Sequence, residues 1–587
     1  MSEYFLAATP GSEKKSSPLP PLPFNARRSS VYGRSHMVSS SQTLASTVGH
    51  NLLMKGANCV AASIAVAAVL AVVEPCSTGL GGDAFALVHD EASRKVEAVN
   101  GSGKSSFLTP SLEDVKAKAG YDKAGGGGWQ NKFHPLTVTV PGAAHMWHSM
   151  YLRYCQGEGL KKFGGEYFTF LDILQPAIDL AENGFPVPGP VTSSAWAAGV
   201  NGQIASWKGQ GMYEGGLPFT SDGTNPPKEG EIFRNPELAE VMRDLGSSGS
   251  DGFYLGSAGK SICETVRKLG GVLTMEDLAG HSTDFLEPIS VTYGDKKLWE
   301  IGPNSQGMAA LIALESLNRV EQTKAPTSEV EELHAMVECM RLGFEDARSH
   351  IADSSFMKVE PTALLSKERL HSRVDKVYDR GKAVAHTQRG ASLGGSCTVS
   401  FQCVDKIGNA VSFVNSNYMG FGTGIVPPDC GFSLQNRGAG FSLEPGQANT
   451  IAPSKRPFHT IIPALATNAR DGTLYATFSN MGGWMQPQGH LQLFHSLVKK
   501  GMSPQDAIDR SRFCIASGER AGELFLEQGF SPGVVDGIRS LGHSVREGAV
   551  EGFERSLFGR AQIIVRKDDG TLVGGSDGRA DGCCIGL

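Results

Sequence analysis

The pattern of apolar and polar positions divides the chain into short strands and amphipathic helices separated by glycine-rich turns. Residues 41–73 are rich in Ala and Val and predict two helices broken around Gly56. Four short apolar runs predict strands: residues 84–88, 96–99, 137–140 and 474–478. Helical spacing predicts four more helices, at residues 168–183, 329–350, 489–499 and 504–513. The pattern as a whole predicts packed sheets with helices outside them.

One stretch, residues 394–424, combines flexible glycines with a strong strand signal. Residues 394–397 are small and impose little steric preference on the backbone. Residues 398–404 form a β-branched and aromatic run typical of a strand. The pair Gly408-Asn409 predicts a turn, and residues 411–414 predict a second strand. Thr398 is therefore expected to open a β-hairpin.

A Thr at the start of a strand can become a nucleophile if the peptide bond before it is cut. Cleavage between Cys397 and Thr398 would give Thr398 a free α-amine with a pKa of about 7.7 to 8.0, which can act as the base for its own hydroxyl. The polar, glycine-containing residues 373–396 suit a mobile leader to such a cut. Thr is also common in strands and Gly-Gly-Ser in loops, so this stretch alone does not decide the function.

Motifs elsewhere decide the family that the chain resembles. They occur in consistent order from about residue 39 to 581: GLGGDAF at 79–85, VPG at 140–142, EPIS at 287–290, GNAV at 408–411, FGTGIV at 421–426, PSKRP at 453–457 and the glycine pair Gly482-Gly483. With these motifs the chain resembles the γ-glutamyltransferase (glutathione hydrolase) family of N-terminal nucleophile hydrolases. The resemblance implies an α+β, four-layer αββα fold. It also implies one globule made of a large subunit (39–397) and a small catalytic subunit (398–587).

The resemblance also implies roles for four residues. Thr398 matches the family's nucleophile, and Ser416 matches a second hydroxyl that hydrogen-bonds it. Gly482 and Gly483 match the glycines whose backbone N–H groups form the oxyanion hole. The alternative for Ser416 is a buried strand serine that bonds only to backbone.

The acyl pocket departs from that of γ-glutamyl enzymes. Five residues align with substrate-binding positions of the family: Ser102, Tyr418, Arg437, His459 and Thr460. Ser102 replaces the family's Arg, and Lys104 is the nearest cation to it. The Asp that would hold an α-ammonium falls on Gly440, and its acidic neighbour falls on Ala439. Arg437 stands beside them, and a guanidinium favours a carboxylate over an ammonium. The alternative is that Arg437 points outward and only caps a loop.

Composition and charge exclude some functions. A net charge of −6 with dispersed basic residues argues against a nucleic-acid partner. The 11 cysteines are odd in number and irregularly spaced, so neither a disulfide framework nor a zinc site is expected. We expect no metal or other cofactor. Cys397 would end as a chain terminus.

The first 38 residues are rich in Ser and Pro and contain no apolar run typical of a signal peptide. They predict a disordered N-terminal tail. The most apolar stretch, residues 59–73, is too short to cross a bilayer and predicts a buried helix. We therefore expect a cytoplasmic protein with no membrane partner.

These features predict an enzyme that cuts itself and then hydrolyses a small-molecule amide through an acyl ester on Thr398, with acyl transfer to an amine as a side activity. The family default for the donor is glutathione or another γ-glutamyl compound. An alternative is an acylase or amidohydrolase for an acid-bearing acyl group of the glutaryl or oxalyl type. An alternative of another class is an unprocessed, non-catalytic homologue.

Overall fold

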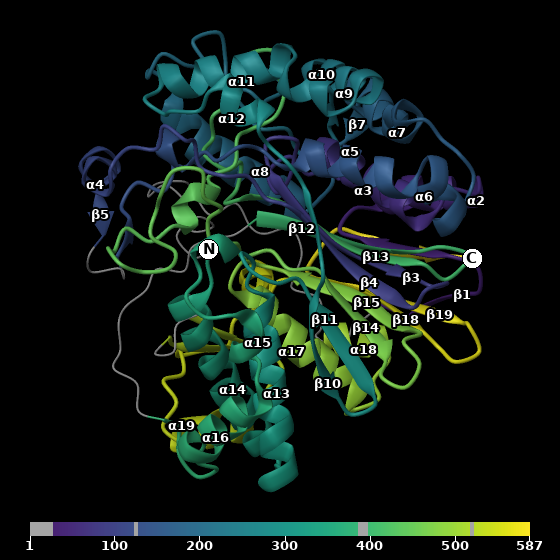
Figure 1. Ribbon diagram of the computed structural model, residues 1–587, viewed down its shortest axis with the longest axis vertical. Coiled ribbons are helices and arrows are strands. Elements are labelled where there is room, and N and C mark those ends of the chain that lie inside the picture. Colours follow the sequence, from purple (N-terminus) through teal and green to yellow (C-terminus); the bar gives the residue numbers. More distant parts are fainter. Residues whose placement is uncertain (1–27, 123–126, 385–396, 517–521) are drawn as a thin grey trace, which may run out of the picture.

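Two seven-stranded antiparallel sheets pack face to face in the computed structural model, which describes residues 28–122, 127–384, 397–516 and 522–587 (Figure 1). The first sheet has the order β20 (Cys583–Gly586), β2 (Met37–Ser40), β12 (Cys397–Val404), β13 (Ala410–Tyr418), β3 (Asp83–Asp90), β4 (Lys95–Gly101) and β9 (Asp284–Leu286). The second has the order β1 (Val31–Gly33), β19 (Leu572–Ser576), β18 (Arg560–Arg566), β15 (Leu474–Met481), β14 (Ala464–Asn468), β11 (Lys296–Glu300) and β10 (Ile289–Tyr293).

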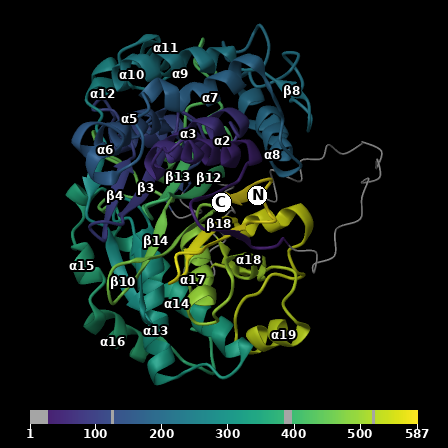
Figure 2. The same cartoon turned by 90° about the vertical axis from the view of Figure 1, so that its right-hand side faces the viewer.

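Helices cover the outer face of each sheet. Over the first sheet lie α2 (Thr43–Met54), α3 (Cys59–Val73), α5 (Ala143–Tyr154), α7 (Phe170–Asn183) and α9 (Pro236–Ser248). Over the second lie α13 (Gly307–Thr323), α14 (Glu329–His350), α16 (Lys367–Val377), α17 (Met485–Val498) and α18 (Pro504–Asp509). Seen from the side, the layers follow one another as helix, sheet, sheet and helix (Figure 2). The predicted αββα architecture is confirmed.

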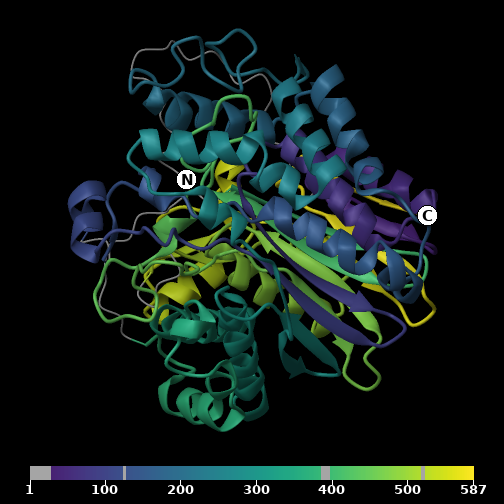
Figure 3. The ribbon, with the colours of Figure 1, turned by 45° about the horizontal axis from the view of Figure 1, so that its top comes forward.

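Shorter elements complete the described chain. The remaining helices are α4 (Leu112–Ala119), α6 (Gly157–Phe163), α8 (Val191–Gly199), α10 (Ser250–Tyr254), α11 (Ser257–Lys268), α12 (Met275–Ala279), α15 (Pro361–Leu364) and α19 (Pro532–Ser540). The small strand pairs are β5 (Tyr121–Asp122) with β6 (Gly128–Trp129), β7 (Phe185–Pro186) with β8 (Ile232–Phe233), and β16 (Phe513–Ile515) with β17 (Leu524–Leu526). Turning the molecule forward brings the upper helices in front of the sheets (Figure 3).

Helix α3 explains the most apolar stretch of the sequence. All 15 of its residues are buried, because it lies beneath the other upper helices and directly on β12 and β13. Asn58 caps its first turn by accepting from the N–H groups of Val60 and Ala61. Within the described residues, no helix has both the length and the apolar character needed to cross a membrane.

Three expectations about local structure are wrong. Residues 137–140 do not form a strand; Pro135–Thr137 is a single 3-10 turn. The helix expected over 504–513 ends at Asp509, and Phe513 begins β16. Residues 31–33 and 37–38, expected to be disordered, belong to strands instead, because β1 pairs with β19 and β2 pairs with both β12 and β20. Residues 1–27 and the second half of the predicted leader, 385–396, lie outside the described part of the chain.

Candidate active site

Thr398 lies at the start of β12, where the ladder to β13 is irregular. The register shifts between Cys397 and Val399, so Ser416 and Asn417 together lie opposite Thr398. This bulge turns the two hydroxyls toward each other, and Thr398 Oγ1 is 2.9 Å from Ser416 Oγ. Both side chains are buried. The structure therefore brings together the two hydroxyl residues that the sequence paired.

The hydroxyl of Ser416 is also held from the other side. Its oxygen accepts from the backbone N–H of Tyr418 at 2.9 Å and from Arg437 Nη2 at 3.3 Å. Two donors on the oxygen favour an orientation in which the Ser416 O–H donates to Thr398 Oγ1. Tyr418 has a φ of 76°, a conformation that is strained for a residue with a Cβ. That turn at the end of β13 is what brings the Tyr418 N–H back to Ser416.

Arg437 is the cation of the site. It opens a short 3-10 turn (Arg437–Gly440) and is fully buried. Nη1 donates to Thr460 Oγ1 at 2.9 Å, and the guanidinium lies 4.2 Å from the centre of the Tyr418 ring. Nε has no hydrogen-bond partner among the described residues. The alternative of an outward-pointing Arg437 is wrong, because its head group faces the Thr398–Ser416 pair.

Asp83 lies behind Arg437 and has no counterpart in the residues singled out from the sequence. It opens β3 directly opposite Ser416, and its Oδ2 is 3.9 Å from Arg437 Nε and 3.1 Å from His459 Nε2. Burial raises the pKa of Asp83 to about 7, against the opposing effect of Arg437. Burial also lowers the pKa of Arg437 to about 10 and that of His459 well below its usual range. The sequence signal that could have identified Asp83 is its position as the single acidic residue of the GLGGDAF motif.

A chain of hydrogen bonds links Arg437 to the turn formed by Gly482 and Gly483. Thr460 accepts from Arg437, and Gln306 Nε2 donates both to the Thr460 carbonyl and to the Gly483 carbonyl, at 2.8 Å for the latter. Gly482 and Gly483 follow β15 directly, with φ of 132° and 59°. Such positive φ values favour glycine. Gln306 is a second residue that the sequence did not reveal.

Two of the predicted pocket residues have no direct hydrogen bond to Thr398 or Arg437 among the described residues, and their role stays a prediction. Ser102 donates to Asn100 Oδ1 at 2.7 Å and lies 3.3 Å from Asn304 Oδ1, so its hydroxyl serves a separate buried amide cluster. The side chain of Lys104 is exposed. Among the described residues, no hydrogen bond joins either of them to Thr398 or Arg437. His459 is connected to Arg437 only indirectly, through its contact with Asp83.

One buried group of residues has donor atoms that could suit a metal ion, although the sequence spacing did not predict it. His334, Glu338 and His543 place ligand atoms within 4.8 Å of one another. His334 Nδ1 is 2.7 Å from His543 Nε2, whereas two nitrogens on one tetrahedral zinc lie roughly 3.3 Å apart. The observed spacing is therefore that of a hydrogen bond between the rings. His334 Nε2 bonds to the carbonyl of Asp379.

Comparison with known proteins agrees with this geometry. A family model described as Gamma-glutamyltranspeptidase matches residues 45–587. The chain belongs to the gamma-glutamyltranspeptidase family. This family member is 31% identical over 564 residues to the glutathione hydrolase-like YwrD proenzyme of Bacillus subtilis, covering 95% of this chain and 99% of that protein. It is 32% identical over 546 residues to the oxamate amidohydrolase proenzyme of Klebsiella pneumoniae, covering 92% and 97%.

A solved structure confirms the fold class. The cephalosporin acylase of Bacillus halodurans superposes with a TM-score of 0.83 at 34% identity, covering 98% of this chain and 99% of that one. The family member therefore has the N-terminal nucleophile hydrolase fold. The expectation of a hydrolase is confirmed as well, since the family and these relatives are hydrolases.

Proposed function

We propose that this family member cleaves itself before Thr398 and then hydrolyses amides whose acyl group carries a carboxylate. The observation that carries the proposal is the buried guanidinium of Arg437, which lies one hydroxyl group away from Thr398 and uses two of its five N–H donors in hydrogen bonds among the described residues. A buried cation with unused donors is a binding site for an anion. The names of two relatives, an oxamate amidohydrolase and a cephalosporin acylase, are consistent with an acyl group other than γ-glutamyl.

The missing acids support the same choice. Where γ-glutamyl enzymes are expected to hold an ammonium, this chain has Ala439 and Gly440. A Cβ added to Gly440 would lie 2.7 Å from the carbonyl oxygen of Phe458, so an Asp at this position would not fit without a backbone shift. An α-ammonium beside Arg437 would meet a like charge, which disfavours binding. A γ-glutamyl group is therefore the less suitable donor.

The chemical step uses groups at Thr398 itself. After cleavage, the Thr398 amine takes the hydroxyl proton as Oγ1 attacks the amide carbonyl carbon, and the N–H groups of Gly482 and Gly483 stabilise the oxyanion. The oxyanion then collapses, the C–N bond breaks and the amine passes its proton to the leaving nitrogen. Water, deprotonated by the same amine, attacks the acyl-Thr398 ester. The ester C–O bond then breaks and Oγ1 takes back the proton from the Thr398 amine, so the products are a free acid, the amine released in the first half of the reaction and regenerated Thr398.

The position of Arg437 also bears on acyl length. Because only the Ser416 hydroxyl separates the guanidinium from Thr398 Oγ1, a carboxylate bound to Arg437 lies close to the scissile carbonyl. An oxalyl group, with its carboxylate directly on that carbonyl, suits this short span better than a glutaryl group. Both types should be preferred to an uncharged acyl group.

The test is a panel of anilides with oxalyl, glutaryl, γ-glutamyl and uncharged butyryl groups. A hydrogen-bonded charge pair contributes roughly 1.5 to 3 kcal/mol, so kcat/KM for the oxalyl or glutaryl anilide should exceed that for the butyryl anilide by about one to two decades. Glutaryl should be cleaved at least as well as γ-glutamyl. Arg437→Ala should remove the preference, whereas Lys104→Ala, which removes an exposed cation, should keep it. A clear preference for γ-glutamyl that survives Arg437→Ala would refute the proposal and favour a glutathione-type donor.

A further inference from the structure

The end of strand β15 is held from several sides just before the Gly482–Gly483 turn. Asn480 is buried two residues before Gly482. Its backbone N–H donates to His490 Nε2 at 3.2 Å, and His490 Nδ1 is 2.7 Å from Glu300 Oε1. Because Nε2 accepts, the proton of this imidazole lies on Nδ1 and is donated to Glu300. The peptide of Asn480 is thereby fixed to helix α17 and strand β11.

The side chain of Asn480 is fixed independently. Its Oδ1 accepts from Arg512 Nη1 at 2.9 Å. Two glycines make room for it, since a Cβ on either Gly489 or Gly559 would come closer than 3.0 Å to the Asn480 amide. A Cβ on Gly482 would in turn lie 3.2 Å from Gly559 Cα. Asn480, Gly559 and Gly482 therefore form one tightly packed unit.

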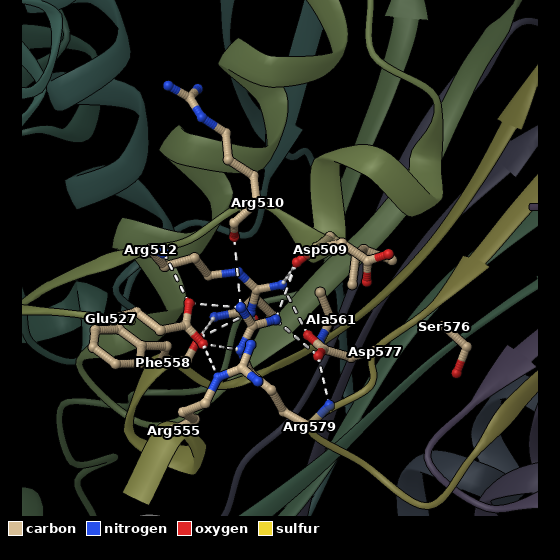
Figure 4. A network of polar contacts seen from close by, with 12 residues as sticks. Asp509, Arg510, Arg512, Glu527, Arg555, Phe558, Ala561, Ser576, Asp577 and Arg579 are labelled. Atoms are coloured by element: carbon tan, nitrogen blue, oxygen red, sulfur yellow. Dashed lines mark hydrogen bonds and ion pairs between the residues drawn. The ribbon is translucent and has the colours of Figure 1, made fainter. Parts of the chain in front are cut away.

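Arg512 belongs to a buried ionic network that leaves its head group little freedom (Figure 4). Besides Asn480, it donates to the carbonyls of Ile508 and Phe558 and to Asp577 Oδ2, the last at 2.8 Å. Burial alone would raise the pKa of Asp577, but Arg512 and Arg579 hold it well below its usual range. The acid is thus charged, and the pairing that orients Arg512 persists at neutral pH.

A second acid, Glu527, joins the network to other parts of residues 398–587. Glu527 accepts from the backbone N–H of Arg512 at 2.9 Å and from the side chains of Arg555 and Arg579. Both acidic side chains, Asp577 and Glu527, are fully buried. Figure 4 shows them facing the arginine head groups. Such ion pairs do little for stability, but they restrict the orientation of the side chains that they join.

We propose that Asn480 is a positioning residue for the Gly482–Gly483 turn, and that the Arg512–Asp577–Glu527–Arg579 network and the Glu300–His490 pair exist to hold it. This inference rests on the proposed role of the two glycine N–H groups as oxyanion donors. Such donors act only if they are aimed at the oxyanion, and displacements of about 1 Å can cost about 100-fold in rate. The loss should therefore fall on turnover and not on substrate binding.

The variant to test is Asn480→Ala, because it removes the side-chain amide that accepts from Arg512 and leaves the buried ion pairs in place. We expect kcat to fall by about 10- to 100-fold with KM changed less than about twofold. Asn480→Asp keeps an oxygen for Arg512 and should recover part of the loss. The matched control is Asn468→Ala, on the adjacent strand β14, whose side chain bonds only to Thr473 away from the site. That variant should keep wild-type kcat.

A second measurement does not depend on activity. In hydrogen–deuterium exchange of the processed protein, Asn480→Ala should speed exchange in peptides spanning residues 481–485, while Asn468→Ala should not. Unchanged exchange there, or a normal kcat in folded Asn480→Ala, would overturn the inference. Faster exchange in an enzyme with no amidase activity would keep the positioning role and reject the proposed function instead.

Discussion

At the scale of single residues, the site depends on hydroxyl groups whose orientation is set by their neighbours. Ser416 accepts from the Tyr418 N–H and from Arg437, and its hydroxyl lies within hydrogen-bond distance of Thr398 Oγ1. A hydroxyl that already donates to Oγ1 stabilises the negative charge that develops there as the Thr398 proton leaves. Ser416 is thus more than a buried strand serine bonded to backbone.

Replacing Ser416 should therefore reduce turnover. Ser416→Ala removes a hydrogen bond to a charged atom, worth roughly 1.5 to 3 kcal/mol, so kcat should fall by about 10- to 100-fold with some self-cleavage retained. Ser416→Thr keeps the hydroxyl and should retain most activity. Steady-state kinetics on the preferred anilide check both variants, and wild-type turnover in Ser416→Ala would count against the pairing.

Asp83 gives the protein a measurable pH dependence. Its pKa of about 7 in the fold lies above the value of about 3.9 in an unfolded chain. The folded protein therefore binds the proton more tightly, and this stabilisation is complete below pH 4 and lost as the pH rises through 7. The cations around Asp83 are Arg437 and Arg456, and the imidazole of His459, whose pKa burial lowers well below its usual range, also contacts it.

Asp83→Asn should remove that dependence. The decline in unfolding free energy between pH 4 and 7 should become shallower by at least roughly 1 kcal/mol, as measured by denaturant titrations at several pH values. His36 and His50, which contact each other far from the site, provide a control, since His50→Asn should leave this decline in place. Parallel curves for wild type and Asp83→Asn would show that Asp83 does not titrate in this range.

At the scale of elements, the Gly482–Gly483 turn depends on close packing between β15 and β18. Gly559, just before β18, approaches the Met481 carbonyl so closely that a Cβ would come within 3.0 Å of it. Gly570, in the turn after the same strand, has a similar φ of 82° but open space around it. Substitutions at the two glycines can therefore be compared to distinguish the cost of backbone strain from the cost of a steric clash.

Substituting these glycines should give different losses. Gly570→Ala should cost only the strain of a positive φ, about 1 kcal/mol. Gly559→Ala adds a clash with backbone and should cost roughly 2 to 4 kcal/mol, with a correspondingly larger drop in melting temperature. Equal melting temperatures would mean that the end of β15 can shift to make room.

Sequence patterns predicted the elements whose signal is local. The hairpin from Thr398 and the helices α3 and α14 follow from residue runs long enough to carry a period. Strands β1 and β2 have three and four residues in a polar context, and their pairing with the C-terminal strands is a long-range contact. The run at 137–140 was misread because apolar, β-branched residues also occur in buried extended loops.

The sequence likewise predicted some residues of the candidate site and missed others. Thr398, Ser416 and Arg437 were found because motif spacing locates them, and the structure joins them by hydrogen bonds. Ser102 stays a prediction, because its hydroxyl bonds to Asn100 and Asn304, and a short sequence motif does not fix the direction of a side chain. Asp83 and Gln306 reach the site from distant segments, and only the fold shows that they meet it.

At the scale of the whole molecule, the proposed cut would divide the chain but not the fold. Strands from both sides of Thr398 are paired in both sheets, at β2–β12, β3–β13, β2–β20, β1–β19 and β11–β14. Separating the two chains would break these ladders and expose the core between the sheets. The processed chains should therefore elute together in size-exclusion chromatography and unfold in one transition. A small chain that dissociates without denaturant would contradict this.

The central claim is that Thr398 becomes the first residue of a separate chain. The most direct test is intact-mass spectrometry of the purified wild-type protein, with Thr398→Ala measured alongside. The account predicts two wild-type chains, the smaller with the mass of residues 398–587, and a single uncut chain for Thr398→Ala. A wild-type protein that stays whole, or a small chain that begins at another residue, would contradict it.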